Sequence, residues 1–152
     1  MRTVVDVPVE YAFSYLADIR NRGEWAAEVV RVENTSPGSI GVGSTYTVWI
    51  RLRVWPFGSS EVSSNHEVTD FVPNRRIVWE VEATGSRIRA FCEVEPANGG
   101  TRIILVNEWA RVSPLLLPVM PLLYVVRLLC RPFIRRQESR MLQRLKQRLE
   151  SA

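Results

Sequence analysis

The feature that most constrains the fold is a long run of alternating apolar and polar residues between residues 28 and 112. The run breaks into strand-length segments with period-two alternation, which favours half-buried β-strands. Short turn signals such as Pro73-Asn74 and Asn98-Gly99 separate them. Because parallel strands need long crossover connections, links this short predict an antiparallel meander. The predicted strands are Val29–Thr35, Thr45–Val54, Ser60–Val72, Arg76–Ala83, Ser86–Glu95 and Thr101–Val112.

Helical segments flank this meander. Met1–Val7 is rich in Val and predicts one further strand, and Val9–Asp18 and Ile19–Trp25 predict two short helices. Phe133–Leu149 carries a single apolar stripe, which predicts an amphipathic helix long enough to lie across a sheet. A curved antiparallel sheet has one face to bury, and this helix can cover it. We therefore predict an α+β fold in which a sheet of about seven strands wraps round the C-terminal helix. One domain is expected over residues 1–152.

The positive charge is concentrated at the C-terminus. The chain has a net charge of +4, but residues 131–152 alone hold seven Lys or Arg and two Glu. The body is nearly neutral and has no nucleic-acid-binding motif, so we expect no nucleic acid partner. Cys92 and Cys130 form no disulfide framework, and the first residues do not have a signal-peptide pattern. These features predict a cytoplasmic protein.

Three stretches in a characteristic order span nearly the whole chain. The first is Val5–Asp18, which contains a Pro-x-Glu helix start, followed by Trp25. The second is Val68–Trp79, a hairpin around a Pro-x-Arg turn, and the third is Gly99–Ile103 with the closing helix Leu142–Glu150. Together they resemble the START-like SRPBCC superfamily, specifically its polyketide cyclase/dehydrase-like branch.

The resemblance implies a helix-grip fold with a cavity between the sheet and the long helix. Members of this superfamily bind hydrophobic or amphipathic small molecules, and some cyclise or dehydrate polyketides. Catalytic residues differ between branches, so none is carried over. We predict that this chain binds a small hydrophobic or amphipathic ligand in that cavity, as a carrier, sensor or scavenger. The alternative is a polyketide cyclase- or dehydratase-type enzyme that acts on a ligand in the same cavity.

Strand alternation predicts which side chains face the cavity. The apolar positions of each strand form the inward set, and opposite charges on neighbouring strands remain outside. Asn107 and Trp109 continue the inward row of the last strand. An interior Asn needs a hydrogen-bond partner, which a ligand carbonyl, a cavity water or a backbone group could supply. The predicted ligand-binding residues are Ile50, Leu52, His66, Val68, Trp79, Val81, Ile88, Ala90, Leu105, Asn107 and Trp109.

His66 is the only histidine, and alternation places Asp70 on the same face of its strand. A neutral imidazole near pH 7 could act as a general acid or base on a carbonyl, and the carboxylate could orient it. The alternatives are a strand histidine that forms a local hydrogen bond or faces solvent, and an aspartate that stabilises the following turn. The sequence has no metal-ligand spacing, nucleophile motif or cofactor fingerprint, so we expect neither a metal nor a cofactor.

The segment Leu115–Cys130 is apolar, contains prolines and precedes the Arg-rich helix. It is shorter than the roughly 20 residues that span a bilayer. An apolar segment beside a basic helix is typical of a membrane-surface contact. The alternative is a cover for the cavity mouth. A lipid-transfer or membrane-docking module that uses residues 115–136 is therefore a third hypothesis.

Overall fold

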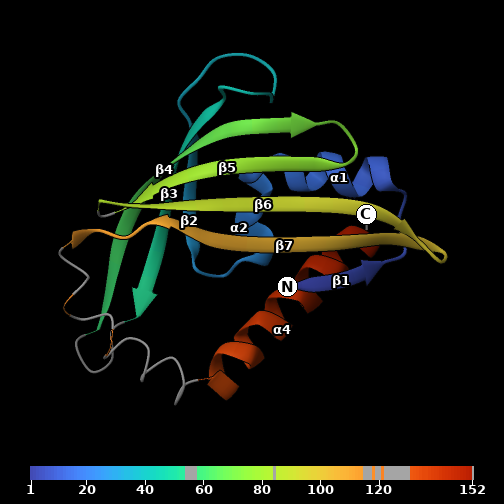
Figure 1. Ribbon diagram of the computed structural model, residues 1–152. Coiled ribbons are helices and arrows are strands. Elements are labelled where there is room, and N and C mark those ends of the chain that lie inside the picture. The colour runs from blue at the N-terminus through green and yellow to red at the C-terminus, as the bar shows by residue number, and fades with distance from the viewer. Residues whose placement is uncertain (54–57, 84, 115–117, 119–120, 122–130, 152) are drawn as a thin grey trace.

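The computed structural model describes residues 1–53, 58–83, 85–114, 118, 121 and 131–151, and its centre is one antiparallel sheet (Figure 1). The sheet has seven strands in the order β1-β7-β6-β5-β4-β3-β2. Strands β2 to β7 therefore form a meander, and β1 closes the edge beside β7. The predicted antiparallel arrangement is confirmed. The strands are β1 (Arg2–Val5), β2 (Val29–Asn34), β3 (Thr45–Arg53), β4 (Ser59–Val72), β5 (Arg76–Ala83), β6 (Ser86–Ala97) and β7 (Gly100–Arg111).

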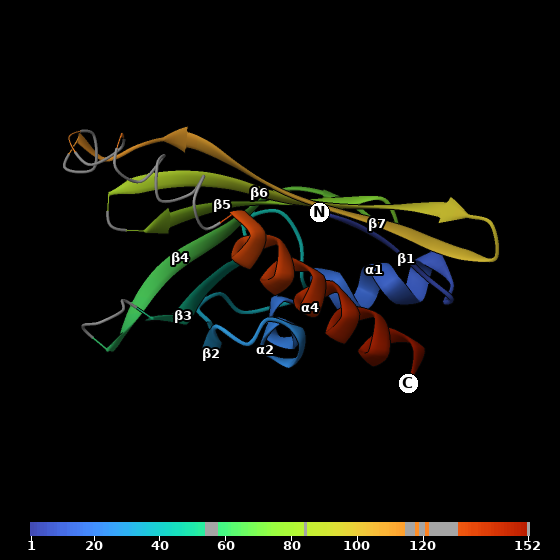
Figure 2. The same cartoon turned by 90° about the horizontal axis from the view of Figure 1, so that it is seen from below.

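The described helices all lie on one side of the sheet, which curls round them (Figure 2). Helix α4 packs against β1 and α2, and α1 packs against β6 and β7. The predicted α+β helix-grip architecture is confirmed. The helices are α1 (Val9–Ala17), the 3-10 turn η1 (Ile19–Asn21), α2 (Arg22–Trp25) and α4 (Arg131–Glu150).

The apolar stripe of α4 anchors this helix to the sheet. Leu145 and Leu149, one helical turn apart, are fully buried in a cluster that includes Phe13, Ile77 and Ile103. At 0% exposure, Ile77, Ile103 and Leu145 mark the centre of the core. The 3.6-residue period of the helix and the two-residue period of the strands thus bury their apolar positions against each other.

The edge between β1 and β7 depends on a glycine. A Cβ atom at Gly100 would lie 2.1 Å from the carbonyl oxygen of Val5, so a side chain cannot be accommodated there. The neighbouring Gly99 has a φ of +83°, in the left-handed region that favours glycine. Thr101 then donates a hydrogen bond from Oγ1 to the Val7 carbonyl oxygen (2.7 Å). Gly99, Gly100 and Thr101 therefore hold β1 against β7 at the edge of the sheet.

The predicted apolar segment Leu115–Cys130 lies outside the described residues, apart from Pro118 and Pro121. In the part of the chain that the structure describes, no helix combines the length and apolar character needed to cross a membrane. The proposed membrane contact through residues 115–136 therefore stays a prediction.

Candidate functional site

The floor of the candidate site is a ladder of inward-facing side chains on β5, β6 and β7. Trp79 lies opposite Ala90, and Ala90 lies opposite Asn107, while Cys92 lies opposite Leu105 in the next row. Neighbouring strands are about 4.8 Å apart, so roughly 9.6 Å separates the backbones at Trp79 and Asn107. The side chain between them is the single methyl group of Ala90. The small side chains of β6, which lies between β5 and β7, therefore create the hollow.

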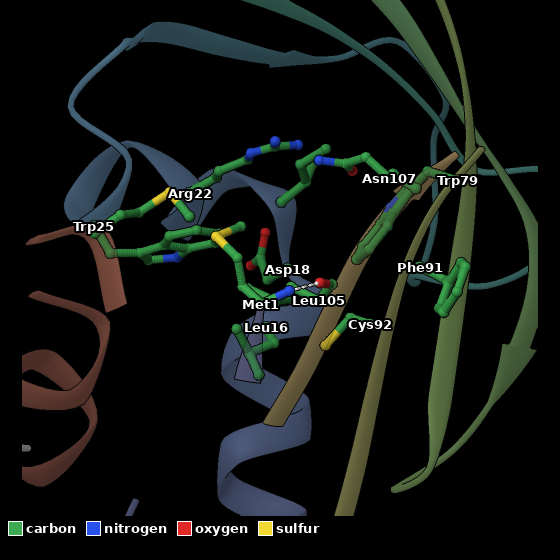
Figure 3. Close-up of a pocket in the computed structure, with 13 residues that line it drawn as sticks. Met1, Leu16, Asp18, Arg22, Trp25, Trp79, Phe91, Cys92, Leu105 and Asn107 are labelled. Carbon is green, nitrogen blue, oxygen red and sulfur yellow. Dashed lines mark hydrogen bonds between the residues drawn. The ribbon is translucent and has the colours of Figure 1, made fainter. Parts of the chain in front are cut away.

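A cavity of about 50 Å³ lies over this ladder, between the sheet and the helices, and with its open mouth the hollow measures about 550 Å³. Figure 3 shows Arg22 and Trp25 entering it from the helical side, and Trp79, Cys92 and Asn107 from the sheet. The enclosed part has room for only a few water molecules, whereas pockets that bind drug-sized ligands measure roughly 300–1,000 Å³. A ligand must therefore displace lining side chains. The lining residues outside the ladder are Met1, Leu16, Asp18, Ile19, Arg22, Trp25, Phe91 and Met141.

The corner between α1 and α2 holds the helical wall in place. The side chain of Asp18 accepts hydrogen bonds from the backbone N–H of Arg20 (3.1 Å), from its Nε (2.7 Å) and from its Nη2 (2.6 Å). These bonds lower the pKa of the Asp18 carboxyl, and they start the separate turn η1 within the predicted helix Ile19–Trp25. Asn21 Nδ2 donates to the Tyr15 carbonyl oxygen (3.0 Å), and Tyr15 Oη donates to Glu24 Oε2 (3.0 Å). This network fixes the start of α2.

Arg22, the first residue of α2, projects from this corner along the cavity toward Asn107 (Figure 3). Its side chain makes no hydrogen bond or ion pair with the described residues, and its Nε atom is buried without a partner. Burial lowers the pKa of the guanidinium, and the charge of Glu28 offsets part of this effect. Arginine nevertheless remains protonated in proteins. The cavity therefore contains a positive charge that no described side chain neutralises at close range.

His66 is buried, with 5% exposure, but it is absent from the residues that line the cavity. Its Nε2 lies 3.0 Å from Ser64 Oγ, and that hydroxyl donates to the Val48 carbonyl oxygen (3.3 Å). The hydroxyl oxygen therefore accepts a hydrogen bond from Nε2–H, and Nδ1 is left without a partner among the described residues. Burial, together with the charge of Arg22, lowers the pKa of His66 to about 3. The imidazole is neutral at physiological pH.

Asp70 does not share the face of His66, and that prediction is wrong. A β-bulge between Val68 and Asp70 shifts the register, so that Val68 faces Trp79 but Asp70 faces Val78. The extra residue reverses the alternation beyond it. Asp70 therefore points to the outer face, where it forms an ion pair with Arg76.

The other predicted ligand-binding residues divide into three groups. Those that line the cavity are Trp79, Ala90, Leu105 and Asn107, and Asn107 is exposed at its rim. Those in or against the core are Ile50, Val68, Val81 and Ile88.

Leu52 and Trp109 are exposed by 43% and 59%, so their predicted interior position is wrong. Alternation fixes the face of the sheet on which a side chain lies, but it does not show whether a helix covers that position. The described helices leave the C-terminal end of β7, which carries Trp109, uncovered (Figure 1).

The predicted set contains no residue from the helical wall. A usable signal was present, since Arg22 follows Ile19 by three residues and precedes Trp25 by three. Residues spaced in this way share one face of a helix. Both neighbours are apolar and buried, which indicates that an arginine between them faces the interior.

Comparisons with known proteins agree with this architecture. Residues 1–150 match the model of a family described as "Polyketide cyclase / dehydrase and lipid transport". The uncharacterized protein Rv2574 of Mycobacterium tuberculosis is 28% identical over 141 residues, which cover 89% of this chain and 77% of the relative. The crystal structure of TTHA0849 from Thermus thermophilus superposes with a TM-score of 0.66 at 14% identity, covering 98% of this chain and 94% of the other.

A further solved structure is the di-domain ARO/CYC protein StfQ from the steffimycin biosynthetic pathway. It superposes with a TM-score of 0.63 at 16% identity, covering 96% of this chain and 48% of StfQ. At such identities these two structures establish a shared fold.

Proposed function

Because the chain belongs to the polyketide cyclase/dehydrase and lipid transport family, we propose that it binds a small hydrophobic or amphipathic molecule in the cavity over Ala90. The role we assign is that of a carrier, sensor or scavenger. The observation that carries the proposal is the hollow itself, which lies between the sheet and the helices where the core would otherwise be closed. We assign this binding to the cytoplasm, where a free buried thiol such as Cys92 stays reduced.

The lining of the hollow suits an apolar ligand. Leu16, Trp25, Trp79 and Leu105 supply hydrocarbon and aromatic surface, and a few polar groups stand among them. This combination is typical of small-molecule sites. The side chain of Met141 is flexible and polarizable, so it can move to enlarge the enclosed space at small energetic cost.

The two predicted catalytic residues favour binding over the enzyme alternative. With a pKa of about 3, His66 is a neutral imidazole near pH 7, so it is not the protonated form that serves as a general acid, and it is a weak base. Asp70 lies on the outer face and pairs with Arg76, so it cannot orient that imidazole.

The test fills the hollow and measures the binding of a neutral apolar probe, N-phenyl-1-naphthylamine, by its fluorescence. Ala90→Leu places a larger side chain between Trp79 and Asn107, and we expect at least tenfold weaker binding. Ala110→Leu is the matched control, because Ala110 is exposed on β7, and its affinity should equal that of the unmodified protein. Thermal unfolding verifies that both variants are folded. Unchanged binding by a folded Ala90→Leu protein would overturn the proposal.

A further inference from the structure

Two buried donors at the cavity lack partners among the described residues. One is Nε of Arg22, and the other is Nε1 of Trp79, whose side chain is 7% exposed. Buried polar groups are hydrogen-bonded in the great majority of cases, and an exception requires an explanation. Both residues line the same cavity, Arg22 from α2 and Trp79 from β5. An indole N–H and a guanidinium are donors only, so both require an acceptor oxygen.

The carboxylate already in the cavity does not serve as that acceptor. Asp18 lines the cavity, but it is bound by Arg20 through both Nε and Nη2. Arg20 therefore neutralises Asp18, and the charge of Arg22 remains available. The cavity thus has a cationic, donor-rich end, whereas Leu16, Cys92 and Leu105 supply an apolar remainder.

We propose that the ligand of this cavity is an amphipathic anion, a hydrocarbon body ending in a carboxylate, whose oxygens bind Arg22 and the indole N–H of Trp79. A guanidinium matches the geometry of a carboxylate and binds it through two parallel hydrogen bonds. The exposed amide of Asn107, at the rim opposite Ala90 in the sheet, supplies a further donor. The hydrocarbon body lies over Ala90 and Cys92. This inference rests on the proposed function and names the ligand class.

The test compares two ligands with the same chain and different head groups, decanoate and decan-1-ol. Each displaces N-phenyl-1-naphthylamine from the protein, and the ratio of their affinities measures the contribution of the carboxylate. We expect decanoate to bind at least tenfold more tightly than decan-1-ol. Arg22→Met should reduce this ratio to about one, because methionine is an unbranched side chain of similar length that carries no charge. Arg51→Met, which removes an exposed arginine on the outer face of β3, should leave the ratio unchanged.

A second variant removes only the indole donor. Trp79→Phe keeps an aromatic ring in the ladder, and we expect it to weaken decanoate several-fold while decan-1-ol binds as before. If the probe binds but decanoate has no advantage over decan-1-ol, or if Arg22→Met retains that advantage, the inference is overturned and the proposed function stands. If neither the probe nor either ligand binds, both proposals are overturned.

Discussion

The two ends of the inner face of the sheet follow the same alternation of apolar and polar residues. They differ in how closely their side chains pack and in whether their buried polar groups have hydrogen-bond partners. At one end, Ile77 and Ile103 are fully buried with Leu145, and the polar Thr101 is hydrogen-bonded to the backbone. At the other end, small side chains leave a hollow, and the buried donors of Arg22 and Trp79 lack partners among the described residues. One end is built for stability. The other retains groups that cost stability, and such local violations are typical of binding sites.

The largest expected effect lies at the packed end. Leu145→Ala should lower the free energy of unfolding by about 2–5 kcal/mol, because it removes a fully buried side chain and leaves a cavity. Leu105→Ala is the matched comparison, since Leu105 is half-buried and already borders the hollow. We expect a smaller loss there. Urea unfolding of both variants provides the measurement, and an equal or greater loss for Leu105→Ala would contradict the division into two ends.

The next effect concerns the pH dependence of stability. His66 has a folded pKa of about 3, below its ordinary value of 6.5, so below pH 6.5 the unfolded chain binds a proton that the folded chain does not. The folded state therefore loses stability as the pH falls from 6.5 toward 3, and at pH 5 one such histidine costs about 2 kcal/mol. His66→Gln should remove this contribution. The test is urea unfolding at pH 7 and pH 5, in which the variant should lose about 2 kcal/mol less than the unmodified protein. Equal losses would show that His66 is accessible to protons in the folded state.

A smaller effect of opposite sign is expected at the cavity end. Arg22→Met should raise the free energy of unfolding of the ligand-free protein by about 1 kcal/mol, because it relieves the desolvation of a buried group without a partner. Arg22→Lys keeps a charge at this position and should bring no such gain. The measurement is again urea unfolding. A destabilised Arg22→Met protein would show that Arg22 supports the fold, and it would remove the contrast between the two ends.

The sequence predicted those parts of the molecule that depend on local periodicity. Alternation placed Trp79, Ala90 and Leu105 on the inner face, and the 3.6-residue period placed Leu145 in the core. Asp70 could not be placed correctly, because the bulge that precedes it leaves no clear mark in the apolar pattern.

The helical wall was harder to predict for a different reason. Met141 and Trp25 meet across a distance of more than a hundred residues along the chain, and only the packing of α4 against α2 brings them to one cavity. Alternation also could not predict the exposure of a side chain, because exposure depends on which positions the helices cover. Trp109 is an example.

The smallest expected effect is that of Arg51→Met on the free energy of unfolding. It shows whether the stabilisation expected for Arg22→Met comes from the burial of Arg22 or only from the loss of one positive charge. Arg51 pairs with Glu61 (2.9 Å) on the outer face, where both side chains are about half exposed. Such pairs contribute little because water screens them, so Arg51→Met should change the free energy of unfolding by less than about 0.5 kcal/mol. Both Arg→Met changes remove one positive charge, and only the surroundings differ. If Arg51→Met stabilises the protein as much as Arg22→Met does, the gain comes from lowering the net positive charge. If the gain is confined to Arg22, it comes from the burial of that charge without a partner, which is the state of the cavity that the proposed anionic ligand would relieve.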